Sequence, residues 1–260
     1  GAVDKTKGAA AQEFFDNYYD YALASLDAAS TGKTDMDMTM SGSVTYQGAS
    51  AATFSMKLNA KTDIDYDKLD QSRMAMTGKI NATVSKALTG EDADTKLDQD
   101  ISYYIANGYT YTKMGDVKIK MPISISDALD SFGGANAMMQ VSPLCMIKSI
   151  TKSGDTMTVT YDADSFGGLF DQIFDTAGVD LDGLGIKFDK LDMSATLKNG
   201  KLTGSKVAMN MSIDAADVHL GVAVNADAVV NATGSGVKVE LPADLDTYKE
   251  IIGSADEALQ

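Results

Sequence analysis

DMDMTM (residues 35–40) puts Met36, Met38 and Met40 at alternate positions, with polar side chains between them. A period of two is that of a β-strand, whose successive side chains point to opposite faces of a sheet. We therefore expect a large antiparallel sheet with one wet face and one buried face rich in methionine. The same alternation returns in residues 54–58, 74–76, 191–197 and 207–213.

The strand candidates form two groups along the chain, each with the order of a meander. The Asn107-Gly108 and Asn199-Gly200 turns predict tight hairpins, because both residue types tolerate positive φ. Gly42 and Gly78 lie inside strand patterns, where glycine often marks a bulge or bend, so we expect the sheet to curl and to have a concave side. The expected strands are residues 35–46, 53–65, 73–85, 97–105, 109–113, 146–151, 156–162, 187–197, 202–214 and 218–230, with residues 237–241 as a possible edge.

Helices are expected mainly at the beginning of the chain and between the two strand groups. Residues 9–29 carry one apolar stripe, which we expect to cover part of the apolar sheet face. Short helices are predicted from Ser124, over residues 135–140 and 164–176, and from Pro242. The stripe of the first helix consists of Phe14, Phe15, Tyr18, Tyr19, Ala22, Leu23 and Leu26.

Length and charge bound the class of protein. A chain of 260 residues can bury a substantial core, and we expect residues 1–8 to be a linker and residues 9–260 to form one domain, or two similar halves that share a sheet. The net charge of −15 makes a nucleic-acid partner improbable, because such a surface repels phosphate.

Catalytic and metal-binding patterns are weak throughout the chain. Cys145 is the only cysteine and is expected to be a small buried hydrophobe, while His219, the only histidine, is expected to face solvent. Residues 63–67 alternate carboxylates as a calcium loop does, but Lys68 stands where that loop requires glycine. The methionines of residues 36–40 could attract Cu(I), yet core packing explains them without a metal. We therefore expect no enzyme, no metal site and no cofactor.

The order of elements resembles a known group of exported proteins. It comprises a first amphipathic helix, methionine-rich strands, the run YYIANGYTY (residues 103–111), a strand with Lys118, two short helices, and a closing meander that ends in VELP (residues 239–242). This arrangement resembles secreted bacterial lipoproteins that are similar to the LolA/LppX superfamily of lipoprotein and lipid carriers. The resemblance implies an α+β fold: a strongly curved antiparallel half-barrel, with helices covering its concave face. It also implies a lipidated cysteine upstream of the domain.

The leading hypothesis is a non-enzymatic carrier of a lipid or other hydrophobic small molecule, held between the sheet and its helices. We expect a monomer that is extracytoplasmic, either secreted or anchored to the outer face of the cell membrane through an N-terminal lipid lost from this sequence. The alternative is a structural or protein-interaction module at the cell surface, with a filled core. The candidate ligand-binding residues are Met38, Phe54, Met56, Met76, Phe132, Phe170, Met193, Met209 and Met211.

Overall fold

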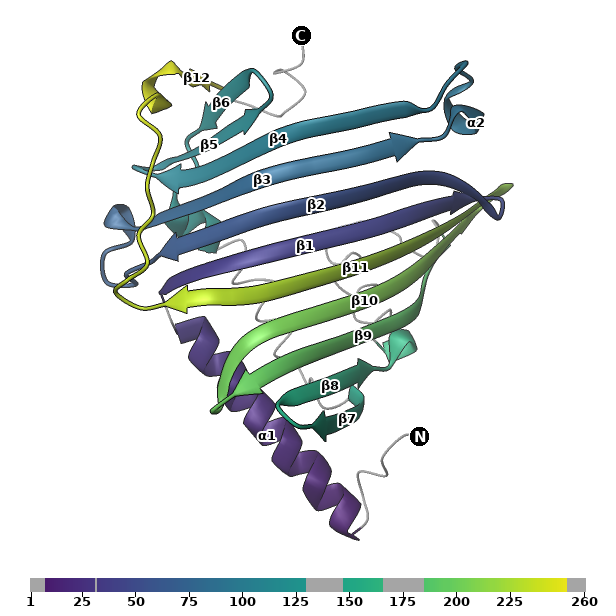
Figure 1. Cartoon of the computed structure of the whole chain (residues 1–260), viewed down its shortest axis with the longest axis vertical. Coiled ribbons are helices and arrows are strands. Elements are labelled where there is room, and N and C mark those ends of the chain that lie inside the picture. Colours follow the sequence, from purple (N-terminus) through teal and green to yellow (C-terminus); the bar gives the residue numbers. More distant parts are fainter. Residues whose placement is uncertain (1–7, 31, 130–146, 166–184, 252–260) are drawn as a thin grey trace.

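The computed structural model describes residues 8–30, 32–129, 147–165 and 185–251. These residues form one sheet of twelve strands, almost entirely antiparallel, in the order β12-β6-β5-β4-β3-β2-β1-β11-β10-β9-β8-β7 (Figure 1). The predicted antiparallel sheet is therefore confirmed.

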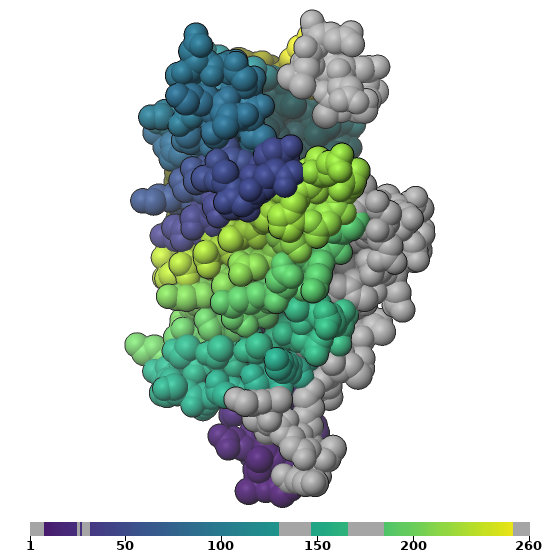
Figure 2. Space-filling model, turned by 90° about the vertical axis from the view of Figure 1, so that its right-hand side faces the viewer, coloured from purple at the N-terminus to yellow at the C-terminus, as the bar shows by residue number. Residues whose placement is uncertain are grey.

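The sheet consists of two meanders that lie side by side and are joined where β1 pairs with β11. In Figure 2 the first meander lies above the second. Each strand of a meander pairs with the next one in the chain, so short turns suffice to connect them. The first meander comprises β1 (Lys33–Tyr46), β2 (Ala49–Asp63), β3 (Arg73–Val84), β4 (Thr95–Ala106), β5 (Tyr109–Met114) and β6 (Val117–Met121). The second comprises β7 (Ile147–Ser153), β8 (Thr156–Tyr161), β9 (Ile186–Lys198), β10 (Lys201–Ala215) and β11 (Val218–Thr233).

Strand register places the alternating apolar residues on one face of the sheet. Met40 lies opposite Met56 on β2 and opposite Ala226 on β11, while Val207 on β10 lies opposite Ala226 and Met193. Side chains that are directly opposite in a ladder share a face. An apolar face therefore runs across both meanders, and polar side chains occupy the other face along the central strands.

The two predicted hairpin turns are confirmed by their backbone angles. Asn107 and Gly108 have φ of 56° and 80°, and Asn199 and Gly200 have φ of 52° and 75°. Positive φ at both central residues gives a turn whose twist matches that of the flanking strands. These turns set the register between β4 and β5 and between β9 and β10.

The expectation of a strongly curved half-barrel was wrong, because the described sheet is neither strongly curled nor closed and has β12 and β7 at its two edges. The bulges expected at Gly42 and Gly78 are also absent, because register runs unbroken through both residues. The register shifts of β1 lie at Asp35/Met36, against β11, and at Val44/Thr45, against β2. Glycine has another role here. A Cβ on Gly78 would lie 1.9 Å from the carbonyl oxygen of Lys57, so the neighbouring strand approaches too closely for a side chain.

The first hydrophobic core lies at the β7 end of the apolar face. Helix α1 (Gly8–Ser30) packs there against β7, β9 and β10, as Figure 1 shows at the lower end of the sheet. Phe14 of α1 contacts a cluster in which Met157 and Val159 of β8 are fully buried. Among the described helices, α1 thus covers one end of the apolar face and not its centre.

The predicted stripe of α1 is only partly directed at the sheet. Phe14 is 1% exposed, whereas Phe15, Tyr19 and Leu23 are 46%, 63% and 48% exposed. The row that faces the sheet also includes Asn17, which the sequence analysis did not select. The prediction was wrong for Phe15, Tyr19 and Leu23 because a stripe that wide spans more of the helix than one sheet contact can bury.

The second hydrophobic core lies on the opposite face, at the β3–β5 end. Ala75, Tyr104 and Tyr111 follow one another across three strands, and Ala75 alternates with methionines that point to the apolar face. Val239 and Tyr248 of the C-terminal segment pack on them, and Figure 1 shows this segment crossing the ends of these strands. The rings of Tyr111 and Tyr248 meet edge to face, 5.4 Å apart.

The C-terminal segment differs from its predicted form. Residues 237–241 are not a strand, and the helix predicted from Pro242 is reduced to a single 3-10 turn, Leu245–Thr247. The chain then extends as β12 (Lys249–Glu250), parallel to β6. Tertiary contact decides this, because the pairing with the free edge of β6 and the burial of Tyr248 require extended backbone.

Of the predicted short helices, the one at Ser124 begins as expected within the described residues. Ser124 Oγ accepts the N–H of Asp127 at 3.1 Å, and Asp127 Oδ2 accepts the N–H of Ser124 at 2.9 Å, which is the reciprocal pair of a capping box. Residues 125–129 are helical. The expected helix over residues 135–140, residues 166–176 of another, and Cys145 lie outside the described residues.

Candidate functional site

A hollow of about 390 Å³ lies over the centre of the apolar face, where the two meanders meet. We call it the methionine hollow. Its walls come from β1, β2, β3, β10 and β11, so residues from both ends of the chain contribute. It is lined by Met38, Thr39, Met40, Met56, Leu58, Met76, Ser205, Val207, Ala226, Asp227 and Ala228.

Small side chains on β11 create this space. Ala226 lies opposite Met40, and Ala228 lies opposite Met38, so a row of alanines separates the β1 methionines from Val207 on β10. An alanine leaves the volume of a larger side chain unfilled beside its neighbours. The hollow therefore follows from register, with small residues aligned against long ones across the strand pairs.

The side chains of the methionine hollow are only half-buried. Met38, Met56 and Met76 all retain partial exposure, in contrast to Met157 in the first core, which is fully buried. The two hydrophobic cores lie to either side, one on the same face and one on the opposite face. The centre of the apolar face is thus the part of the sheet that the described residues leave incompletely packed.

The electrostatic character of the hollow is neutral. Among its lining residues the only charged one is Asp227, which lies opposite Thr39 and Lys206 in the ladder and so belongs to the polar face. Asp227 forms an ion pair there with Lys206, at 3.8 Å. No lysine or arginine is present among the described lining residues, so nothing in the hollow would pair with an anionic group.

The residues selected from the sequence are distributed over this face. Met38, Met56 and Met76 line the hollow. Phe54 lies on the same face, with its ring against Gly42, where a Cβ would come within 2.2 Å of the ring. Met193, Met209 and Met211 share the face but lie outside the hollow, while Phe132 and Phe170 lie outside the described residues.

The candidate ligand-binding residues predicted from the sequence did not include Met40, Leu58, Val207, Ala226 or Ala228, which also line the hollow. The alternation AVNADAVV (residues 223–230) contains the signal for the two alanines, since it places small residues at alternate positions of one strand. What the sequence lacked was the pairing of β1 with β11, which are separated by most of the chain. Without that pairing, the alanines could not be placed beside the methionines.

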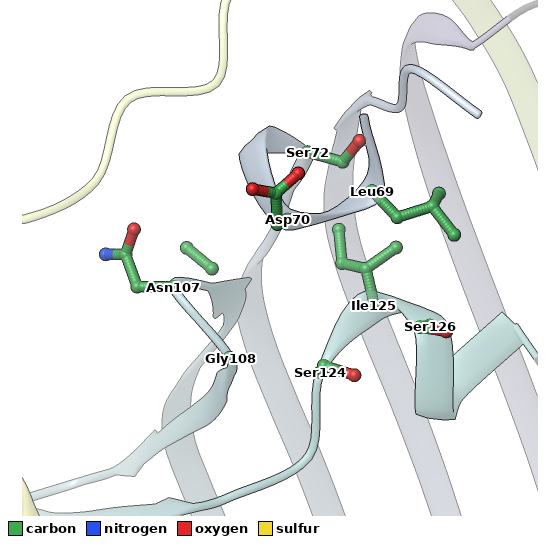
Figure 3. Close-up of a pocket in the computed structure, with 9 residues that line it drawn as sticks. Leu69, Asp70, Ser72, Asn107, Gly108, Ser124, Ile125 and Ser126 are labelled. Carbon is green, nitrogen blue, oxygen red and sulfur yellow. The ribbon is translucent and has the colours of Figure 1, made fainter. Parts of the chain in front are cut away.

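A second pocket, of about 480 Å³, lies at the end of the sheet (Figure 3). It is enclosed by the 3-10 helix Leu69–Gln71, the Asn107-Gly108 turn and the first residues of the helix that begins after Ser124. Ser72 Oγ accepts the N–H of Asp65 at 2.9 Å, and Ser124 is held in its capping box. These polar groups shape the loops, which makes this pocket a weaker candidate than the methionine hollow.

Neither the histidine nor the acidic run at residues 63–67 forms a catalytic or metal-binding cluster within the described residues. His219 is exposed and its Nδ1 contacts Asp214 Oδ1, which fits the expectation that it faces solvent. The acidic residues 63–67 end a strand and enter a turn, in which Asp65 Oδ1 accepts the N–H of Asp67 at 3.0 Å. Within the described parts of the chain, no three acidic, histidine or cysteine side chains cluster as metal ligands do. None of the described helices has the length and apolar character needed to cross a membrane.

Comparison with known proteins places the chain in no family. No protein-family model matches it, and no curated protein sequence is similar to it. Among solved structures, the chain is weakly similar to a DUF1329 family protein from Desulfovibrio piger, with a TM-score of 0.23 and 8% identity. That match covers 84% of this chain and 94% of the other. The LolA/LppX resemblance thus receives no support from these comparisons, and the fold is established only as a large, largely antiparallel sheet.

Proposed function

We propose that the protein binds an uncharged apolar ligand, such as a lipid acyl chain, in the methionine hollow, and that it does so without catalysis. The observation that carries this proposal is the half-buried row of methionines beside a row of alanines on β11. Methionine adapts to irregular apolar shapes and is common on surfaces that accept flexible partners. The volume of about 390 Å³ is within the range of small-molecule sites.

The charge of the site narrows the ligand class. A carboxylate or phosphate inside the hollow would lose hydration without gaining a cation, because the described lining contains no lysine or arginine. The net charge of −15 opposes such groups further. The buried part of the ligand is therefore a neutral hydrocarbon, and any anionic headgroup would remain in solvent.

The LolA/LppX resemblance extends the proposal to location. A carrier of this kind would act outside the cytoplasm, as a monomer that is secreted or tethered by an N-terminal lipid. These features rest on the resemblance alone, and the ligand proposal does not depend on them.

The test is direct titration with a neutral apolar dye, Nile Red, together with native mass spectrometry after mild extraction. Met38→Glu places a charge in the hollow, while Ser41→Glu places the same charge on the opposite face of β1, at a residue that does not line the hollow. We expect Met38→Glu to weaken dye binding at least about tenfold, the effect of roughly 1.4 kcal/mol of lost affinity, and Ser41→Glu to leave it unchanged.

Equal dye binding by both variants, or a protein that neither carries nor takes up any apolar molecule, would contradict the proposal. The second result would favour the alternative function, an interaction module that acts through its outer surface.

A further inference from the structure

Helix α1 carries a second apolar row on the side that faces away from the sheet. Phe15, Tyr19 and Leu23 are 46%, 63% and 48% exposed and follow each other at intervals of four residues. At 1.5 Å per residue they form a ridge about 12 Å long. At 100° per residue the ridge is centred about 180° from the buried row that contains Phe14 and Ala24. We call it the outer ridge.

The contacts among the described residues do not account for the outer ridge. The inner row of α1 already makes the contacts with β7, β9 and β10 that attach the helix to the sheet. Single exposed apolar residues are ordinary on protein surfaces. Leu88, Val117 and Val229 are examples here, because each is exposed on a different element. The outer ridge differs from these single residues, because its three large side chains follow one another on one helix face. Anchor residues have this arrangement on helices that dock into apolar grooves.

Acidic residues lie along one flank of the outer ridge. Glu13, Asp16, Asp20 and Asp27 are all exposed, and they fall within an arc of about 60° on the helix. Asp16 is three residues before Tyr19, and Asp20 is three residues before Leu23, so each aspartate neighbours a ridge residue. Helix α1 contains no lysine or arginine. The flank is therefore uniformly anionic.

We propose that the outer ridge docks into an apolar groove of a partner protein whose rim carries lysine or arginine. The anionic flank determines this choice of occupant. A second copy of the chain would bring another acidic row and another net charge of −15 to the contact, and an anionic lipid surface would repel the flank in the same way. A cationic rim instead complements the flank, while the groove buries the three side chains.

The experiment uses the full chain and a defined probe. The probe is a fluorescent amphipathic helical peptide with a leucine row flanked by lysines, and its binding is followed by fluorescence anisotropy. We expect the wild-type chain to bind it and Tyr19→Ser to bind at least about tenfold more weakly, as expected for a central aromatic anchor. Asp16→Asn combined with Asp20→Asn should weaken binding and reduce its dependence on salt.

Matched controls separate the outer ridge from general attraction to an acidic protein. Leu88→Ser removes a similarly exposed apolar side chain from another part of the surface and should leave peptide binding unchanged. A peptide with glutamates in place of the lysines should not bind. Because Tyr19 is exposed, Tyr19→Ser should retain the wild-type circular dichroism spectrum and unfolding midpoint.

Three results would overturn the proposal. The first is equal peptide binding by wild type and Tyr19→Ser. The second is self-association in sedimentation experiments that Tyr19→Ser abolishes, which would make a second copy the occupant. The third is binding to phosphatidylcholine vesicles that Tyr19→Ser abolishes, which would make the occupant a lipid surface.

Discussion

The centre and the β7 end of the apolar face share one sequence pattern but differ in packing. Met157 in β8 is 0% exposed beneath α1, whereas Met38 and Met56 in the central strands remain half-buried. Alternation decides which face a side chain occupies, and the element that packs on that face decides whether it is buried. Within the described residues, the same residue type is therefore fully buried at one end of the face and half-buried in the middle.

The largest effect of this difference should appear in stability. Met157→Ala removes a fully buried side chain under α1 and should lower the free energy of unfolding by about 2–5 kcal/mol, because a cavity remains. Met38→Ala, at a half-buried position, should cost about 1 kcal/mol or less. Urea denaturation of both variants measures this contrast, and equal losses would contradict it.

In the central strands, a methyl group added against backbone atoms should destabilise the fold more than one added against a side chain. Gly78→Ala would place its methyl group 1.9 Å from the Lys57 carbonyl oxygen, so we expect a loss of about 1–3 kcal/mol in unfolding free energy. Gly42→Ala meets only the ring end of Phe54, which can rotate away, and should cost less. Thermal unfolding of the two variants tests this ranking of the stability losses. A larger loss of stability in Gly42→Ala than in Gly78→Ala would contradict it.

Filling the methionine hollow should reduce binding without reducing stability. Ala226→Leu directs a larger side chain into the hollow and should weaken the binding of Nile Red about tenfold or more, while the unfolding midpoint stays the same or rises. Asn225→Leu, on the opposite face of β11, is the matched control and should not change dye affinity. Unaltered binding by Ala226→Leu would place the dye elsewhere.

The smallest effect concerns the second core and its dependence on pH. Lys118 Nζ donates a hydrogen bond to Asp244 Oδ2 at 2.6 Å, and this bond is the main reason that the pKa of Asp244 lies below its ordinary value of 3.8. A depressed folded pKa stabilises the native state above the unfolded pKa, and the contribution is lost as pH falls toward the folded value.

We therefore expect the C-terminal segment to loosen below about pH 4, visible as faster amide exchange in β12 and β6. Because Asp244 is exposed, solvent screening keeps the effect small. Lys118→Met should already show the faster exchange at neutral pH and should lose this pH dependence, and an unchanged pH profile in that variant would assign the dependence to another group.

Local signals predicted most strands, and non-local contacts explain the errors. The boundaries of β1, β3 and β10 lie within two residues of their predictions, because alternation and turn residues act over a few positions. The prediction for the C-terminal segment was wrong because residues 249–250 pair with the edge of β6 as a strand. The sequence does not reveal that this edge is free. The half-barrel was expected from a resemblance and from two glycines, but Gly78 accommodates a close strand contact without a bulge.

The residues of the candidate site also fall into two groups, those that a local pattern predicts and those that only strand pairing brings to the site. Met38, Met56 and Met76 could be selected from their period of two, but Ala226 and Ala228 gain their meaning only from the pairing of β1 with β11. Helix α1 could be predicted as amphipathic, although which of its two apolar rows faces the sheet could not.

By itself, the sequence determined that the chain forms long amphipathic strands with one methionine-rich face, since the direction of a strand side chain depends only on its neighbours in the chain. For the described residues, the tertiary structure alone decided where that face is fully buried, where it is half-buried, and which side of α1 is exposed. Those outcomes depend on contacts between residues far apart in the chain, such as β1 with β11 and α1 with β7, which no local pattern encodes.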